Sequence, residues 1–326
     1  MDAMVRSTVD MATDTRRQGV MDAALQEFDH LVVTVPVKTR GGVELTATVT
    51  IQTPYRINYT SVDTAVGTKG YPSRHLPSPD ADGAPSDLGG SVDRAKVGKG
   101  TPADMQTVIQ AAVDQGKVRV PKLDDKLLGA DGKLSEEGNA AVEAALKGWL
   151  TAGKGRLVGV DCSGFIYQIV TRMIATPGDP SPTWMHGLLD TGTGNLKSES
   201  ALTTIESAST LRTGDLLLHG RHVEIVRSST ALSEPDVAAL QDLRLPKGAH
   251  AWQLEVMESS PANNRQGPTS STWLVVQTAT ELQWYKQHGE GWRRQIVTAR
   301  RPDVLGEAPA SDAEQAPGQK KGRKGR

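Results

Sequence analysis

The sequence predicts an α+β fold in which an antiparallel sheet packs against a helix that begins at Cys162. Three patterns predict this fold. Apolar residues follow Cys162 at helical spacing, two apolar strands with a short break between them cover 216–226, and apolar and polar residues alternate over 251–260 and 272–300.

The N-terminal part is expected to supply a helix, a hairpin and a long loop. Residues 8–30 have the partial apolar periodicity of an amphipathic helix. Strands at 31–37 and 43–51 flank Arg40-Gly41-Gly42, which is typical of a hairpin turn. Proline and glycine are frequent over 68–100, so this stretch is predicted to be an exposed loop.

Two helices are predicted between that loop and Cys162. Thr101-Pro102-Ala103-Asp104 resembles a capping box with proline in the first turn, and its helix ends near Gly116. A second helix runs from Ser135 to about Gly153. The segment could form a lid or a wall that selects substrates, or it could pack without a function.

The C-terminal half is predicted to consist mainly of strands. Residues 177–197 are loop-like and are expected to border the cleft, whereas 229–248 form a polar excursion with a short helix at 235–243. Three closing strands are expected at 272–278, 282–285 and 292–300. Four of the six tryptophans lie in this last part, which indicates either a binding groove or packing between strands.

Composition is consistent with one catalytic core plus accessory pieces. The chain has 326 residues, 37 % of them hydrophobic, and a formal net charge of −1. This charge gives no general attraction to nucleic acid, and no apolar run is long enough to span a membrane. The N-terminus lacks the pattern of a signal peptide. We therefore expect a protein made in the cytoplasm that, if exported or injected, uses a route that reads no such signal.

Cys162 is the one cysteine of the chain, so an internal disulfide is excluded. A lone cysteine is either a small buried residue or a nucleophile. Cys162 is predicted to stand at a helix N-terminus, where free backbone N–H groups and the helix dipole favour a thiolate. The same N–H groups could bind the oxyanion of a tetrahedral intermediate.

A thiol nucleophile requires a base, and His222 is the best placed of the seven histidines. It opens an apolar strand directly after a turn. His219 is the local competitor but ends the preceding strand, and His186, His250 and His288 lie in loop-like or exposed surroundings. A structural role for His222 is the alternative.

The third group of such a site orients the imidazole, and Glu258 is the candidate for it. It lies in the strand 251–260, which can pair with the His222 strand. Glu255 would point to the opposite face, so the two glutamates exclude each other. The alternative is that Glu258 is a solvated strand residue.

Four blocks of sequence, in this order, resemble the NlpC-type cysteine peptidases. They are Asp-Cys-Ser-Gly-Phe at 161–165, Gly-Asp-Leu-Leu at 214–217, His-Val-Glu-Ile-Val at 222–226 and Val-Met-Glu-Ser-Ser at 256–260. These papain-like bacterial enzymes mostly cleave the stem peptides of peptidoglycan. The resemblance implies Cys162 as nucleophile, His222 as general base and Glu258 at the polar third position, which is more usually His, Asn or Gln.

The family also carries a Thr-Pro-Tyr segment before the cysteine, whose tyrosine lines the site. Thr53-Pro54-Tyr55 matches it, without the two glycines that usually follow and much farther from the cysteine. The resemblance covers about a third of the chain in scattered blocks. It implies an N-terminal part of the core at 1–60, an insertion at 61–155 and the catalytic core at 156–303. The composition and basic end of 304–326 predict a disordered tail.

The resulting hypothesis is a cysteine peptidase or amidase that works through a thioacyl intermediate. Tyr55, Asp161 and Ser163 are expected to border the substrate or oxyanion site, and the chemistry requires no metal or organic cofactor. Other amide or acyl chemistry stays open, such as a deamidase, a transacylase or a lipid hydrolase. So does a toxin delivered by a secretion or injection apparatus or a phage-like particle, with an immunity protein as a possible partner. A catalytically inactive binding or structural component is the third alternative.

Overall fold

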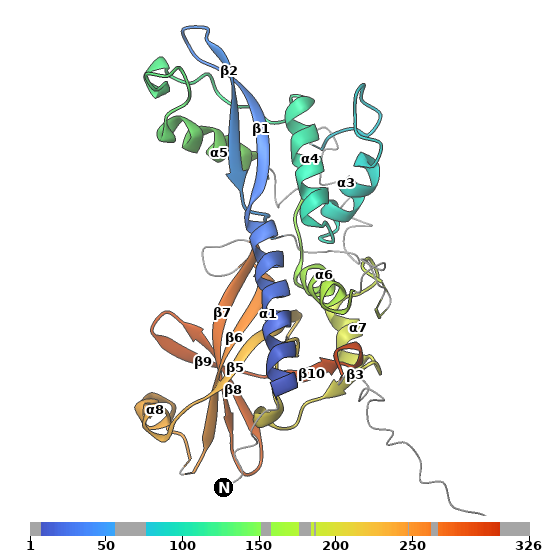
Figure 1. Cartoon of the computed structure of the whole chain (residues 1–326), viewed down its shortest axis with the longest axis vertical. Helices are drawn as coiled ribbons and strands as arrows, with labels where there is room; N and C mark the ends of the chain where they lie inside the picture. The colour runs from blue at the N-terminus through green and yellow to red at the C-terminus, as the bar shows by residue number, and fades with distance from the viewer. Residues whose placement is uncertain are drawn as a thin grey trace, which may run out of the picture.

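The computed structural model describes residues 8–55, 76–150, 158–175, 184–185, 187–246, 248–261 and 267–306. It is a mixed α/β structure with two lobes (Figure 1). One lobe holds a β-hairpin surrounded by three helices, and the other holds a curled antiparallel sheet with two helices against it. The predicted α+β class is therefore confirmed.

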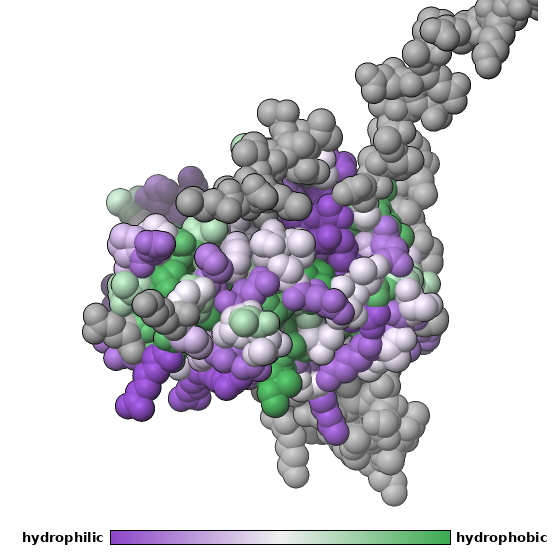
Figure 2. Space-filling model, turned by 90° about the horizontal axis from the view of Figure 1, so that it is seen from below, coloured by the Kyte–Doolittle hydropathy of each residue, from purple (hydrophilic) through white to green (hydrophobic). Residues whose placement is uncertain are grey.

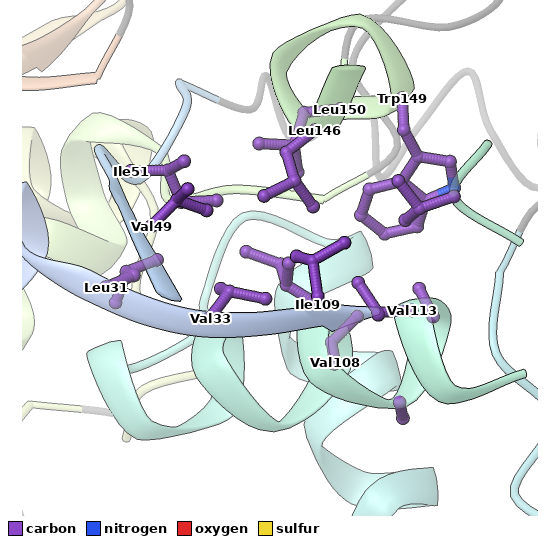
Figure 3. Close-up of a cluster of buried hydrophobic side chains, with 14 of the residues drawn as sticks. Leu31, Val33, Val49, Ile51, Val108, Ile109, Val113, Leu146, Trp149 and Leu150 are labelled. Carbon is purple, nitrogen blue, oxygen red and sulfur yellow. The ribbon is translucent and has the colours of Figure 1, made fainter. Parts of the chain in front are cut away.

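The hairpin of the first lobe consists of β1 (Leu31–Lys38) and β2 (Glu44–Ile51), which confirms the two predicted strands. Buried and exposed residues alternate along β1, as expected for a ribbon with one face covered. The covering helices are α3 (Leu88–Lys96), α4 (Pro102–Asp114) and α5 (Glu136–Leu150). Figure 3 shows Val33 and Val49 of the ribbon facing the helical side chains Ile109 and Leu146.

Helix α3 lies inside the stretch that was predicted to be an exposed loop, so that prediction is wrong for its described part. Leu88, Val92 and Ala95 are buried, and their spacing of four and three places them on one helical face. The prolines and glycines around them concealed this short apolar stripe. Residues 68–75 of the predicted loop lie outside the described residues.

Helix α1 (Thr8–Asp29) belongs to the second lobe and packs on the sheet and on α6. Its buried side chains repeat every three or four residues and include two charged ones: Asp14, Arg17, Met21, Ala24 and Phe28. Arg17 donates hydrogen bonds to the carbonyl oxygens of Thr213 and Leu305. The predicted helix is confirmed, although Met11, counted toward its apolar face, is 57 % exposed.

The sheet of the second lobe has the order β3-β10-β4-β5-β6-β7-β8-β9, with antiparallel neighbours throughout. Its strands are β3 (Leu202–Thr204), β4 (Leu216–His219), β5 (His222–Ala231), β6 (His250–Ser260), β7 (Gly267–Gln277), β8 (Leu282–His288), β9 (Gly291–Gln295) and β10 (Thr298–Pro302). The helices and 3-10 turns around it are α6 (Cys162–Ile174), α7 (Thr193–Ser198), α8 (Glu234–Ala239), η3 (Ala208–Thr210), η4 (Gln241–Leu243) and η5 (Asp303–Leu305), while η2 (Asp125–Leu127) belongs to the first lobe.

The predicted single strand at 292–300 is in fact two strands near opposite ends of the sheet order. Only Ile296 and Val297 separate β9 from β10, and two residues between strand ends can span no more than about 11 Å. The two ends of the sheet must therefore approach each other, which makes the sheet curl. Ile296 is exposed at this crossing.

The sheet has two apolar faces. Leu216, Leu218, Val223 and Ile225 pack with α6, whereas Leu217 and Val226 join Trp273 and Trp284 on the other face. Two of the clustered tryptophans thus serve strand packing, as one of the two interpretations expected. Viewed from below, the visible described surface is largely hydrophilic or neutral with scattered hydrophobic residues (Figure 2).

Two further predictions concern the ends of the chain and the membrane. Leu305, placed in the predicted tail, is buried in η5, and the tail beyond residue 306 lies outside the described residues. Among the helices that the structure describes, none has the length and apolar character needed to cross a bilayer.

Candidate active site

Cys162 is the first residue of α6, as the sequence predicted. The preceding residue, Asp161, has extended backbone angles and caps the helix: its carboxylate accepts a hydrogen bond of 2.5 Å from the N–H of Gly164. Cys162 is 5 % exposed, and its Sγ lies 3.7 Å from Oγ1 of Thr193 at the start of α7. The predicted loop before Lys197 therefore borders the thiol, and its described part includes the first residues of α7.

His222 begins β5 and lies between Cys162 and Glu258. Its imidazole lies close enough to the Cys162 side chain for that thiol to affect the pKa of the imidazole, and its Nε2 lies 2.8 Å from Oε2 of Glu258 on the neighbouring strand β6. A histidine ring has two nitrogen atoms, so the bond from Nε2 to Glu258 leaves Nδ1 for the sulfur. The structure brings the three predicted catalytic side chains together.

The surroundings of His222 favour its charged form. Burial alone would lower the pKa of the imidazole, but hydrogen bonds to Cys162 and Glu258 and the nearby charges raise it to about 10. Burial would raise the pKa of Glu258, yet its hydrogen bond to His222 and the charges of Lys286 and His222 lower it to about 2. At neutral pH an imidazolium therefore faces an ionised carboxylate.

Glu258, not Glu255, is the carboxylate at the site. The Glu258 side chain is fully buried, which rules out the solvated alternative. Glu255 is 43 % exposed and forms an ion pair with Arg227 instead. The two glutamates serve opposite faces of β6, as their spacing predicted.

The carboxylate of Glu258 belongs to a larger buried network that the sequence did not reveal. Lys286 Nζ on β8 lies 2.5 Å from Oε1 of Glu258 and 2.8 Å from Oε1 of Glu224 on β5. Glu224 also accepts hydrogen bonds from Nε1 of Trp273 at 2.7 Å and pairs with Nε2 of His219 at 2.8 Å. The sequence signal that could have revealed it is Glu224, a charged residue flanked by apolar ones in a buried strand.

Among the described residues, His219, His250 and His288 do not take the place of His222. His219 is the closest competitor, but its Nε2 is bound to Glu224. His250 begins β6, eight residues before Glu258, which corresponds to about 26 Å along a strand. His288 ends β8 instead of lying in a loop, and His186 lies outside the described residues.

The Thr-Pro-Tyr segment lies beside the chain that leads into Cys162, despite the long intervening segment. Val160 forms a parallel bridge with Tyr55 and an antiparallel bridge with Lys99. The N–H of Val160 donates to the carbonyl oxygen of Pro54 at 3.0 Å. Tyr55 itself is buried, with 9 % of its surface exposed. The predicted proximity of Tyr55 to the site is thus present at the level of the backbone.

Lys99, in the segment predicted as an insertion, is the second feature that the sequence did not reveal. Its fully buried ammonium lies 3.1 Å from Oδ1 of Asp161, 2.6 Å from Oγ of Ser163 and 2.8 Å from the carbonyl oxygen of Thr191. The side chains of Asp161 and Ser163 are thus occupied in holding the start of α6. Any contact of these two residues with an oxyanion would involve their backbone, because their side chains face Lys99.

Three side chains where β4 ends and β5 begins have the composition of a metal site. The ligand atoms of His219, His222 and Glu224 all lie within 4.8 Å of one another. However, the ammonium of Lys286 already contacts the Glu224 oxygen that would bind the ion, and Nε2 of His222 is directed at Glu258. Because the ammonium and the imidazolium already balance the two carboxylates, the donor set fits protons better than a metal.

No protein-family model, no curated protein and no solved structure matches this chain. The geometry of the site and the local resemblance of its sequence blocks are therefore the two indications of function.

Proposed function

We propose that the protein is a cysteine hydrolase that cleaves an amide bond through a thioacyl intermediate on Cys162. One observation carries the proposal: a largely buried imidazole lies beside the only thiol of the chain and is hydrogen-bonded to a fully buried carboxylate. A thiol at a helix N-terminus beside a charged imidazole is the arrangement that favours a nucleophilic thiolate. We also propose that the curled sheet and α6 form a papain-like core of the NlpC type.

In the proposed reaction, the Cys162 thiolate attacks the carbonyl carbon of the scissile amide. Backbone N–H groups at the start of α6 stabilise the oxyanion of the tetrahedral intermediate. His222 gives its proton to the leaving amine as the C–N bond breaks, which leaves a thioester on Cys162. Neutral His222 then takes a proton from water, whose oxygen attacks the thioester and releases the acid. Glu258 keeps the imidazole oriented throughout.

The substrate class comes from the resemblance to the NlpC-type peptidases. We propose a stem peptide of peptidoglycan, a bacterial cell-wall polymer, as the amide that is cleaved.

The test uses the full chain with purified peptidoglycan and with soluble stem peptides, followed by mass spectrometry. We expect new pairs of amine and carboxylate ends, and none with Cys162→Ser or His222→Ala. Glu255→Gln, which changes the partly exposed glutamate of the same strand, is the matched control and should keep the activity. Cleavage of other amides but not of stem peptides would contradict the substrate. If iodoacetamide does not label Cys162 at neutral pH, the proposed enzymatic activity is contradicted.

A further inference from the structure

The buried polar network behind His222 contains one cation that the proposed mechanism does not use. We propose that Lys286 is a positioning residue for His222: its ammonium bridges Glu224 and Glu258 and keeps Glu258 ionised and fixed against Nε2. This inference rests on the proposed function. It assigns a role to a residue three strands away from His222 in the sheet order.

The contacts of the two glutamates account for all four carboxylate oxygens. Oε1 of Glu258 accepts from Lys286 and Oε2 faces His222. Oε2 of Glu224 accepts from Trp273, while Oε1 contacts Lys286 at 2.8 Å and His219 at 2.8 Å. Among these partners, Lys286 hydrogen-bonds both glutamates, whereas His222 hydrogen-bonds Glu258 and lies farther from Glu224, at 3.7 Å. Lys286 therefore fixes how the two carboxylates are placed relative to each other.

The need for this cation follows from burial. Both glutamates are fully buried, and two buried carboxylates that share one region favour the uptake of a proton by one of them. A protonated Glu258 would no longer balance the imidazolium. Glu224 is also a competitor, because its Oε1 lies 3.7 Å from Nε2 of His222. The Lys286 ammonium neutralises the charge of Glu224 and so weakens its competition with Glu258 for His222.

Lys286 is itself held in place from several sides. Its Nζ lies 5.5 Å from the centre of the ring of Trp273, the residue that pairs with Lys286 on the neighbouring strand β7. Burial would lower the pKa of the ammonium, but the charges and hydrogen bonds of Glu224 and Glu258 raise it, so Lys286 remains a cation.

The titratable and charged groups around the network come from several elements. They are Cys162 on α6, His219 on β4, His222 and Glu224 on β5, Glu258 on β6, Lys286 and His288 on β8 and, beyond these, Arg293, which pairs with Lys286 on β9.

The test compares Lys286→Met with the double variant Glu224→Gln/Lys286→Met, which removes one charge of each sign. The readouts are the labelling rate of Cys162 by iodoacetamide, followed by intact mass, and the titration of His222 by NMR of labelled histidine. We expect Lys286→Met to slow labelling at neutral pH by about tenfold and to lower the titration midpoint of His222 by about one pH unit. The double variant should restore both to near the wild-type values.

The outcomes separate electrostatic positioning from mere packing. Wild-type labelling and titration in Lys286→Met would overturn the proposal, and so would a double variant no better than the single one. If Lys286→Met does not fold, the double variant decides: recovered folding and labelling support the proposal, and failure to recover overturns it. Neither readout needs a substrate, so a lack of peptidoglycan cleavage would contradict the proposed function without changing these results.

Discussion

The charge on His222 depends on three side chains from three different elements: Cys162 of α6, Glu258 of β6 and Glu224 of its own strand. Removal of His222 should therefore lower the reactivity of the Cys162 thiol more than removal of Glu258 or Glu224. His219 is a suitable comparison, because its ring centre lies 5.3 Å from that of His222 and both rings are exposed to a similar extent.

We therefore expect His222→Ala to slow labelling of Cys162 by iodoacetamide at pH 7 by tenfold or more, about the effect of one pKa unit. His219→Ala should change the rate by no more than about threefold, because His219 is bound to Glu224. Intact mass spectrometry measures both rates without ambiguity in a protein with one cysteine. Equal effects of the two substitutions would contradict the assignment of His222 as the partner of the thiol.

Glu258 and His222 also make stability depend on pH. The pKa of His222 rises from 6.5 to about 10 on folding, so its contribution is complete below about pH 6.5 and is lost as the pH rises through 10. The pKa of Glu258 falls from 4.5 to about 2, so its contribution is present above about pH 4.5 and is lost as the pH falls through 2. Both contributions to stability are therefore complete between about pH 4.5 and pH 6.5.

From this we predict that Glu258→Gln lowers the free energy of unfolding most between about pH 4.5 and 6.5, and flattens the decline on both sides. Urea denaturation at a series of pH values from 2 to 10 measures this. Glu255→Gln, the matched control in the same strand, removes a partly exposed ion pair and should change stability by less than about 1 kcal/mol at any pH. A Glu258→Gln profile parallel to that of the wild type would be inconsistent with the pair.

The sequence was informative about residues whose role is local. Cys162 was found because its helix starts with a recognisable pattern, and His222 because it opens a strand directly after a turn. Lys286 and Lys99 could not be found in this way. Each becomes part of the site only when distant strands or segments are brought together, and a lysine in isolation predicts exposure.

At the scale of elements, the start of α6 is held by the last turn of α3 and the chain segment that follows it. The N–H of Asp161 donates to the carbonyl oxygen of Gly98 at 2.7 Å, and Gly159 donates to Ala95 at 3.1 Å. Gly164, the glycine of the Asp-Cys-Ser-Gly block, allows this close approach: a Cβ atom there would overlap the carbonyl oxygen of Gly98. This glycine is therefore required by packing.

We expect Gly164→Ala to lower the free energy of unfolding by about 1–3 kcal/mol, because the obstacle is backbone and cannot turn aside. The matched control is Gly148→Ala, a helical glycine of α5 whose Cβ would have no neighbour within 4 Å. It should leave stability unchanged or raise it by about 0.5–1 kcal/mol. Urea denaturation compares the two variants. Equal effects would contradict the close approach of the Gly98 carbonyl oxygen to Gly164.

Lys99 offers a second test of the same junction. Lys99→Met removes the cation from the buried carboxylate of Asp161, a change expected to destabilise by about 3–5 kcal/mol. Lys96→Met, three residues earlier on an exposed part of α3, should change stability by less than about 1 kcal/mol. Thermal unfolding measures both. A Lys99→Met protein as stable as the wild type would contradict the role of Lys99 at the start of α6.

Elements were predictable wherever their pattern was local. The hairpin of β1 and β2, the capping box of α4 at Thr101 and the start of α6 all follow from short stretches of sequence. Helix α3 was missed because Gly89 and Gly90 lie in its first turn, where they weaken the helical signal. The burial of Leu88, Val92 and Ala95 against the first lobe outweighs that preference, and a single sequence does not display such burial.

At the scale of the whole molecule, the order of the strands was the least predictable feature. The alternation of 272–300 predicted strands, but not that the chain crosses from one end of the sheet to the other between β9 and β10. The hairpin was also expected to belong with the catalytic core, whereas its buried face shares a hydrophobic core with α4 and α5. Both features depend on contacts between distant segments.

The two lobes are connected next to the candidate site, which has a consequence for unfolding. Thr53, after β2, donates its N–H to the carbonyl oxygen of Phe28 in α1, and Val160 bonds to Pro54. Lys99 adds a buried ion pair across the same junction. Because these contacts link the first lobe directly to the segment that leads into Cys162, we expect the two lobes to unfold together.

Ile109→Ala tests this expectation because it destabilises the first lobe, whereas the labelled residue Cys162 lies in the second. Ile109 is fully buried between α4 and the hairpin, so its truncation should lower the free energy of unfolding by about 2–5 kcal/mol. The urea midpoint should fall equally when followed by circular dichroism and by labelling of Cys162 in the other lobe. Val43→Ala, at an exposed position of the first lobe, should move neither midpoint. If labelling kept its wild-type midpoint while the dichroism midpoint fell, the first lobe would unfold independently, and the junction at Lys99 would not couple it to the site.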